Sequence, residues 1–383
     1  MCLAEVPFYR RRGGRPEDFF ALPTCGREDL AREPWSFVPD GQPLDEMIVY
    51  DTSGTSSRPI YILSHPVVAS MYLPALRAAL KRCGVTLEGG SGRVSIITVC
   101  AQSYTLTYAT ISSYLDGAGY VKVNLNPKEW RDPDDRALFL DSCNPEIYTG
   151  DPVSFLALAK LPLETRPKAL VSSAMTLLPG LKRELEEHFE CPVLDVYSMN
   201  ESRFIAVDVG AGYEIIPHDL YVEILDREGN ACPPGVRGEI VLTGGRNPFL
   251  PLLRYRTGDY AALEFRGRQP VLVDFEGRKP TVFINTEGRI VNNIDVTYAL
   301  KPFPIGQFSL HQNRDRSLLF RLRESRADEE AVRKALLELF GRDQKIVIEE
   351  LTEDLLRGGK VLQYTSDIAE LSLESSEIYW NHR

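Results

Sequence analysis

Apolar residues recur along the first two thirds of the chain in two spacings that alternate. Short apolar or β-branched runs are typical of buried strands and occur at 93–100, 120–123, 147–149, 168–172 and 193–197. Apolar residues at helical spacing occur around them, at 65–83, 104–115, 136–142, 152–161 and 179–189. The alternation predicts a mostly parallel sheet with helices on both faces, and Pro74 predicts a kink or a break in the first helix.

Tight turns replace the helices after about residue 204. Strands are expected at 214–217, 220–225, 238–243, 260–265 and 271–273, and together they predict a β-rich subdomain. Its most polar stretch is PLLRYRTGD, residues 251–259. We predict a turn that tightens at Gly258 and directs Asp259 outward, where a carboxylate can accept bonds from two sugar hydroxyls. A charged hairpin turn without a ligand explains the same residues.

Residues 276–280, EGRKP, indicate a junction, because glycine and proline flank two cations between strand-like segments. Beyond it the pattern predicts strands at 281–284, 289–291, 317–322 and 345–350, and a helix at 327–340. We therefore predict an α/β fold in two parts. Residues 1–278 form a large domain of layered parallel sheets and helices with the β-rich subdomain, and residues 279–383 form a small α+β lid. The first 48 residues are expected to be an irregular arm with short helices.

The composition is that of a soluble globular protein, with 383 residues, 43% apolar content and a formal net charge of −10. This charge excludes nucleic acid or an anionic membrane as the main partner, but not a nucleotide in a local pocket. The seven cysteines are spread singly, which disfavours a disulfide framework or a zinc site. No apolar run approaches the roughly 20 residues that span a bilayer, and no signal-peptide pattern opens the chain. The cytoplasm is the expected location.

A hydroxyl-rich loop, DTSGTSSRP at 51–59, separates two short apolar segments. Hydroxyls and backbone N–H groups of such a loop can wrap a polyphosphate, and a cation at its end neutralises charge. The loop lacks the GxxxxGK[ST] pattern that leads into a helix, and a solvated hairpin turn is the alternative. Two more loops, 172–175 and 198–201, follow strands of the predicted parallel sheet, at whose carboxyl ends ligands bind.

In this order, the segments resemble the adenylate-forming superfamily of AMP-binding acyl- and aryl-CoA synthetases. The similarity is to its short branch around phenylacetate-CoA ligase and CapK-like proteins, and it runs along nearly the whole chain. The matched motifs are VPFYR at 6–10, the SSGTTGKP-like loop at 51–59, a Gly-Gly-Glu-like turn at 172–174, YSMNE for YGxTE at 197–201, RYRTGD at 254–259 and the GRxDD-like junction at 277–278. Lys360 stands where the family has its C-terminal catalytic lysine. The resemblance implies an adenylation domain over residues 1–278 and a mobile lid over 279–383.

The resemblance also implies roles for the matched residues. Those that would hold the phosphates of ATP are Ser53, Gly54, Thr55 and Arg58. Those that would meet the rest of the nucleotide are Ser173, Ala174, Tyr197 and Ser198, with Tyr197 stacked on adenine. Asp259 would accept both ribose hydroxyls, with Arg278 nearby on ribose or phosphate.

For the chemistry itself, the resemblance implies Glu201 as the Mg²⁺ ligand and Lys360, Arg278 and Asn200 as catalytic residues. Lys360 would lie between the α-phosphate and the attacking carboxylate. Attack of a carboxylate on the α-phosphate brings two anions together, so cations, a metal and loop N–H groups must take up charge as pyrophosphate leaves. The predicted activity is therefore ATP-dependent conversion of a carboxylic acid to an acyl- or aryl-adenylate. Transfer to a thiol or amine acceptor, and the use of CoA, stay open.

Three departures from the family pattern bear on the second step. The loop carries Ser57 and Arg58 where the family has Gly-Lys, and Asn200 replaces a hydroxyl. Pro280 stands at the hinge aspartate, where its fixed φ should hinder rotation of the lid. Since that rotation changes the superfamily from adenylate to thioester formation, we expect the first half-reaction to be kept and thioester formation to be impaired.

Two alternatives stay open on the sequence. One is an acyl-CoA synthetase of the phenylacetate-CoA ligase kind that tolerates Pro280. The other is a catalytically impaired nucleotide-binding protein. The sequence names neither the acid nor the oligomeric state, and a homodimer is the common assembly among relatives.

Overall fold

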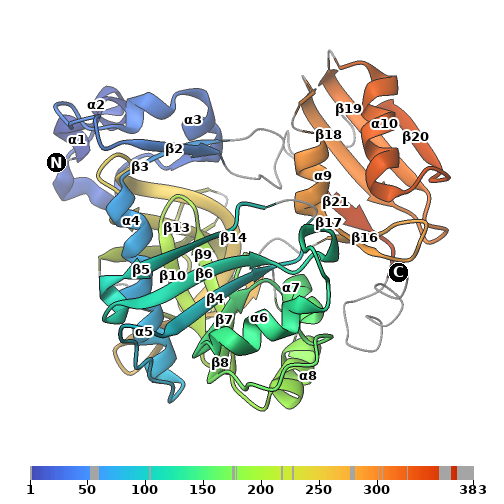
Figure 1. Cartoon of the computed structure of the whole chain (residues 1–383). Coiled ribbons are helices and arrows are strands. Elements are labelled where there is room, and N and C mark those ends of the chain that lie inside the picture. Colours follow the sequence, from blue (N-terminus) through green and yellow to red (C-terminus); the bar gives the residue numbers. More distant parts are fainter. Residues whose placement is uncertain are drawn as a thin grey trace.

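The computed structural model describes residues 2–51, 60–102, 105–174, 177, 179–216, 219–226, 228–276, 281–300, 302–303, 305–325, 327–352 and 364–368 (Figure 1). Eight residues singled out in the sequence lie outside this part: Ser53, Gly54, Thr55, Ser57, Arg58, Arg278, Pro280 and Lys360. Their roles therefore stay predictions.

One 13-stranded sheet forms the centre of the larger part. Its strands are β1 (Cys25–Gly26), β4 (Val94–Cys100), β5 (Tyr108–Ser112), β6 (Ala118–Asn124), β7 (Ile147–Gly150), β8 (Ala169–Ser172), β9 (Val193–Met199), β10 (Arg203–Asp208), β11 (Tyr213–Ile215), β12 (Leu220–Leu225), β13 (Gly238–Gly244), β14 (Leu252–Arg266) and β15 (Gln269–Glu276). The order is β12-β13-β14-β15-β11-β10-β9-β8-β7-β4-β6-β5, with β1 on β14. The pairing is parallel from β6 through β4, β7 and β8 to β9. On its other edge β9 pairs antiparallel with β10, where the antiparallel half of the sheet begins. The predicted parallel and β-rich regions are thus halves of one sheet.

Helices cover both faces of the parallel half (Figure 1). They are α5 (Tyr72–Arg82) on one face and α6 (Asp135–Cys143), α7 (Pro152–Leu158) and α8 (Pro179–Phe189) on the other, and the short helix α4 (Pro66–Ser70) precedes α5. Leu76 of α5 shares a core cluster with Ile96, and Phe155 of α7 shares another with Ile97. Because successive side chains of a strand point to opposite faces, neighbouring residues of β4 pack against helices on opposite faces of the sheet. The α/β prediction is confirmed. The predicted kink or break is a break, and it lies at Met71, which leaves Pro74 in the first turn of α5.

The helix predicted at 104–115 is wrong. Residues Tyr108–Ser112 form β5, which pairs antiparallel with β6 at the edge of the sheet and is followed by the 3₁₀ helix η3 (Ser113–Leu115). The segment 104–115 contains three threonines and three tyrosines, residues that favour an extended backbone. The Ser112 hydroxyl accepts a bond from the Tyr114 N–H and so starts the 3₁₀ turn.

The predicted turn at Gly258 is also wrong. Residues 251–259 do not separate two strands, because β14 runs without interruption from Leu252 to Arg266. The register with β13 shifts between Glu239 and Val241, so the segment around Gly258 is a bulge, and Gly258 takes a φ of 80°. A bulge turns side chains of a strand without ending it. Asp259 is thereby directed at β9, which does not pair with β14 in the sheet.

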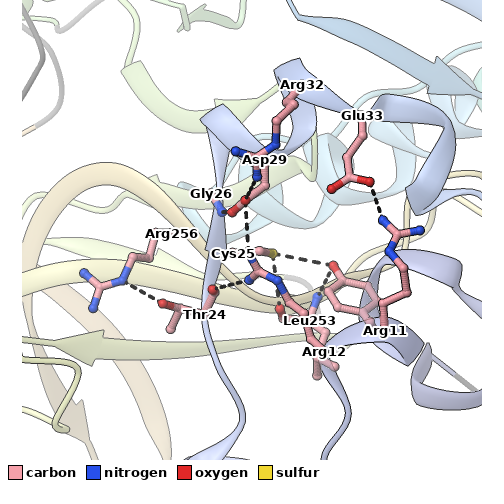
Figure 2. A network of polar contacts seen from close by, with 11 residues as sticks. Arg11, Arg12, Thr24, Cys25, Gly26, Asp29, Arg32, Glu33, Leu253 and Arg256 are labelled. Carbon is pink, nitrogen blue, oxygen red and sulfur yellow. Dashed lines mark hydrogen bonds and ion pairs between the residues drawn. The ribbon is translucent and has the colours of Figure 1, made fainter.

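The N-terminal arm lies along β14 (Figure 2). Its elements are α1 (Cys2–Glu5), α2 (Pro7–Arg12), η1 (Pro16–Ala21), α3 (Arg27–Arg32), η2 (Pro34–Phe37), β2 (Ile48–Asp51) and β3 (Tyr61–Ser64). The Tyr9 hydroxyl donates to the Pro251 carbonyl at 3.1 Å and accepts from the Leu253 N–H at 3.0 Å. Arg256 Nε donates to Thr24 Oγ1 at 3.1 Å. Backbone and side-chain bonds together fix the arm to the strand.

A smaller α+β unit follows residue 280 (Figure 1, orange). It contains β16 (Val282–Ile284), β17 (Ile290–Asn292), α9 (Asn293–Leu300), β18 (Ile305–Gln312), β19 (Leu318–Ser325), α10 (Glu329–Phe340), β20 (Ile346–Glu350) and β21 (Tyr364–Ser366). Strands β20-β19-β18-β21 form a sheet that shares a core of its own with α9 and α10. The sequence pattern did not predict β18 or α9, and the role of this unit as a lid stays a prediction.

Arg254 joins the arm to the sheet. Its side chain is only 4% exposed and forms two hydrogen bonds with the equally buried Glu223, at 3.0 and 3.2 Å. The guanidinium also donates to the carbonyls of Phe20 and Leu22 in the arm, each at 2.6 Å. Breaking a buried ion pair leaves one charge in the interior without compensation.

We therefore expect Arg254→Ala to lower the free energy of unfolding by about 3–5 kcal/mol, measured by denaturation with urea. The matched control is Arg321→Ala, whose partner Glu349 has a side chain 45% exposed, and a loss of at most about 1 kcal/mol is expected there. Replacing both members by apolar residues, as in Arg254→Met with Glu223→Leu, should recover most of the loss. Equal stability of Arg254→Ala and the native chain would contradict this account.

Candidate active site

The predicted nucleotide loops lie at the carboxyl ends of neighbouring parallel strands. Ser172 ends β8 opposite Asp195 of β9, and the Ser173 N–H donates to the Gly150 carbonyl at the end of β7, at 2.9 Å. Ala174 has a φ of 68°, a left-handed backbone that is uncommon for a residue with a side chain. This strand edge is where open α/β sheets bind ligands.

Asp259 is held by β9 from across the sheet. The Tyr197 hydroxyl donates to Asp259 Oδ2 at 2.9 Å, and both residues are buried. The Thr257 hydroxyl accepts from the Asp259 N–H at 3.1 Å and donates to the Ile240 carbonyl at 2.9 Å. Burial, together with the nearby Asp259 carboxylate, raises the pKa of Tyr197 well above its ordinary value, so the phenol remains a donor. These bonds fix the carboxylate that the motif singled out.

Tyr197 is a core residue as well as a motif residue. Only 7% of it is exposed, and its ring lies 4.6 Å from the Phe275 ring, measured between centroids. Its hydroxyl contact supports a role in positioning Asp259, and stacking on adenine stays a prediction. The next motif residues are more accessible, since Ser198 is half-buried and Asn200 is exposed.

Glu201 follows β9 and is also tied to β14. The Tyr255 hydroxyl donates to Glu201 Oε1 at 3.1 Å, and Arg27 of α3 lies 3.5 Å from the same oxygen. Glu201 is only 5% exposed. Within the described ranges, the other oxygen, Oε2, has no hydrogen-bond or ion-pair partner, and no group of three or more acidic, histidine or cysteine side chains could enclose a metal. A single carboxylate oxygen fits Mg²⁺, which is commonly held by one or two carboxylates, substrate phosphates and water.

The base of the hydroxyl-rich loop lies beside this turn. Tyr50 of β2 precedes the loop, and its hydroxyl donates to the Asn200 carbonyl at 3.4 Å. On the far side of the loop, Ile60 is fully buried in the same cluster as Tyr255. The two ends of the loop therefore lie against the segments that carry Glu201 and Asp259.

A third buried carboxylate, Asp195, lies on β9 beside the site. The Tyr213 hydroxyl donates to Asp195 Oδ2 at 2.5 Å, and the Leu177 N–H, which follows the turn at Ala174, bonds to the same carboxylate. Nearby, Lys182 and Asp208 form an ion pair at 2.7 Å. Burial raises the pKa of Asp195 to about 6.

Four residues of this site were missed by sequence reasoning: Arg27, Tyr50, Asp195 and Arg203, which donates a hydrogen bond to Tyr50. Tyr50 directly precedes one matched motif and Arg203 stands two residues after another, and that closeness was the available signal. Asp195 stands two residues before Tyr197 in an otherwise apolar strand, where a carboxylate is unusual. Arg27 carries no local signal, because only the folded arm brings it to Glu201.

Comparison with known proteins shows sequence similarity to phenylacetate-coenzyme A ligases. The chain is 23% identical to that of Pseudomonas putida, over 67% of this chain and 62% of the relative. It is 24% identical to that of Escherichia coli (strain K12), over 67% and 63%, and 27% identical to Protein CapK of Staphylococcus aureus, over 36% and 31%. The alignments thus span less than two thirds of each relative's length. No family model matches the chain.

Solved structures share the fold. A crystal structure of 2-hydroxyisobutyryl-CoA ligase in an open conformation, with 2-HIB-AMP and CoA, aligns with a TM-score of 0.57 at 20% identity, covering 95% of this chain and 88% of that one. The crystal structure of the same ligase in the thioesterification state, with the same two ligands, aligns with a TM-score of 0.61 at 20% identity, covering 96% of this chain and 86% of that one. Together with the sequence similarity, this supports the resemblance to the phenylacetate-CoA ligase and CapK-like branch. Among the described residues, no helix is long and apolar enough to cross a membrane.

The raised pKa of Asp195 gives a test of the site's electrostatics. A folded-state pKa above the unfolded value means that the carboxyl stabilises the fold fully below about pH 4, and that this contribution is lost as the pH rises through about 6. Asp195→Asn removes the ionisation. We expect it to be more stable than the native chain at pH 8, by up to about 3 kcal/mol, with the difference shrinking toward pH 4.

The measurement is urea denaturation of both proteins between pH 4 and 8. The control is Asp116→Asn, whose side chain is 65% exposed, and it should change the free energy of unfolding by at most about 0.5 kcal/mol. A stability difference for Asp195→Asn that is the same at every pH would contradict the assignment.

Proposed function

We propose that this chain uses ATP to convert a carboxylic acid to an acyl- or aryl-adenylate, with release of pyrophosphate. The observation that carries the proposal is the meeting of three motif regions that are far apart in sequence. Tyr197 binds Asp259, Tyr255 binds Glu201, and Tyr50 binds the backbone of Asn200. A site with these three regions offers a carboxylate for ribose, a carboxylate for a metal and a loop for phosphates.

The reaction sets the requirements on these groups. A carboxylate oxygen of the acid forms a bond to the α-phosphorus, and the bond from that phosphorus to the leaving pyrophosphate oxygen breaks. Negative charge gathers on the phosphates in both steps, so the site must hold positive charge in fixed positions. Asp259 would orient the ribose, and Ser173, Ala174 and Ser198 would line the nucleotide.

Glu201 would hold Mg²⁺ through Oε2. When bound, this ion would shield the phosphates from the incoming carboxylate. Arg27 and Tyr255, both on Oε1, keep the carboxylate in one orientation. The residues predicted to complete the site, including Ser53, Arg58, Arg278 and Lys360, lie outside the described residues.

A second candidate function is formation of an acyl-CoA thioester. The similarity to phenylacetate-coenzyme A ligases favours it, and Pro280 at the expected hinge argues against it. A thiol or amine other than CoA is the third option for the acceptor. The seven free cysteines support a reducing compartment, and we propose the cytoplasm.

The proposed reaction is tested by ATP–pyrophosphate exchange with a panel of carboxylic acids, in the presence of Mg²⁺. Exchange that depends on one class of acid is expected, and addition of CoA then shows whether a thioester forms. Abundant acyl-CoA would contradict the prediction that Pro280 impairs thioester formation. It would not contradict the proposed adenylation step. ATP binding without exchange for any acid would favour a nucleotide-binding protein.

Asp259→Asn tests the ribose contact within the same assay. Replacing the carboxylate by an amide weakens two charge-assisted hydrogen bonds, so the KM for ATP should rise at least about tenfold. The control is Asp274→Asn on the neighbouring strand β15, which is exposed and should leave the KM for ATP unchanged. An unaltered KM in a correctly folded Asp259→Asn protein would remove this residue from the nucleotide site.

A further inference from the structure

Arg203 occupies an unusual place in the backbone. It begins β10 directly after the turn that carries Asn200 and Glu201, and it pairs in register with Met199 of β9. Its φ is 67°, in the left-handed region that side-chain-bearing residues rarely adopt. Such conformations concentrate at functional sites, where the surrounding structure holds them in place. A glycine would adopt this conformation without strain, yet an arginine stands here.

The side chain of Arg203 is held against the base of the hydroxyl-rich loop. Its guanidinium carbon lies 5.0 Å from the centre of the Tyr50 ring, and Nη2 donates to the Tyr50 hydroxyl. The Nε atom is buried and has no hydrogen-bond partner within the part of the chain that the structure describes. Tyr50 therefore orients the cation but satisfies only one of its donors.

The charge of Arg203 is likewise uncompensated by the described residues. No aspartate or glutamate of this part of the chain lies within ion-pair distance of its guanidinium, although Glu201 is only two residues away. Glu201 instead takes Arg27 and Tyr255 as partners. A partly buried arginine with unpaired donors is costly unless an anion completes the site.

The surroundings indicate which anion this is. Tyr50 stands two residues before the loop at 52–59, its hydroxyl binds the Asn200 carbonyl, and Glu201 acts electrostatically on it. Arg203 thus lies where the base of the loop meets the expected metal ligand. A guanidinium presents its donors in a planar fork that matches the oxygens of a phosphate.

We propose that Arg203 binds the β- and γ-phosphates of ATP and that Tyr50 holds it in position for that contact. This inference rests on the proposed function, because it takes the loop at 52–59 as the phosphate loop. It adds a fixed cation from the sheet to those expected from the loop and the lid. The β- and γ-phosphates leave as pyrophosphate and are absent from AMP. Arg203 therefore contacts ATP but not AMP.

The test compares the affinities of the full chain for ATP with Mg²⁺ and for AMP, measured by calorimetry. Arg203→Gln should weaken the affinity for ATP at least about tenfold and the affinity for AMP less than about twofold. A charged hydrogen bond to phosphate is lost only in the complex with ATP. Arg203→Lys should recover part of the ATP affinity, since it keeps the charge but not the fork. Tyr50→Phe should give an intermediate loss for ATP.

Folding effects are separated by two further variants. Arg203→Gly removes the side chain and relieves the left-handed backbone, so it should be at least as stable as the native chain and still lose ATP affinity. Arg316→Gln is the matched control, because Arg316 also has a left-handed φ, of 66°, and lies in the smaller unit. It should bind both nucleotides like the native chain.

The outcomes are distinct. An unchanged ratio of ATP to AMP affinity in Arg203→Gln and Arg203→Gly overturns the role of Arg203 and leaves the proposed function intact. An equal loss for both nucleotides indicates a structural role and also overturns the inference. A native chain that binds neither nucleotide rejects both the proposed function and this inference.

Discussion

Two reciprocal tyrosine-to-carboxylate bonds between β9 and β14 determine the geometry of the candidate site. Tyr197 of β9 donates to Asp259 of β14, and Tyr255 of β14 donates to Glu201 after β9. Burial raises the pKa of both phenols well above the ordinary value, so both remain protonated donors at neutral pH. Because residues 197–201 and strand β14 each supply one donor and one acceptor, neither carboxylate can shift without breaking a bond to the other segment.

Strand β14 serves the arm and the site at the same time. Arg254 holds the backbone of Phe20 and Leu22, whereas the bulge at Gly258 directs Asp259 toward β9. The arm in turn supplies Arg27 to Glu201. The N-terminal segment, which has weak periodicity in sequence, is therefore part of the structural support of the site. Its folding and the orientation of a proposed metal ligand are coupled through one strand.

Much of the fold could be predicted because local pattern and tertiary structure agree. The strands and helices from β4 to β9 follow from apolar periodicity, and β5 does not, since short apolar segments fit a helix or a strand equally well. Residues 108–112 form a strand because they pair with β6. The residues of the Gly258 bulge have the composition of a turn. Only the register with β13 shows that they form a bulge and not a turn. The contact of Tyr197 with Asp259 joins residues 62 apart, which no local pattern encodes.

The arrangement of cations around Glu201 follows from the charge balance of the proposed reaction. The chain carries a net charge of −10 and would bind a polyanionic nucleotide next to a second anion, so local positive charge has to outweigh the overall field. Arg27 is already paired with Glu201 and orients it, whereas Arg203 is oriented by an uncharged phenol and keeps its charge for a ligand. A cation held by a neutral donor-acceptor group is preorganised without being neutralised, which is the condition under which it stabilises developing charge most strongly.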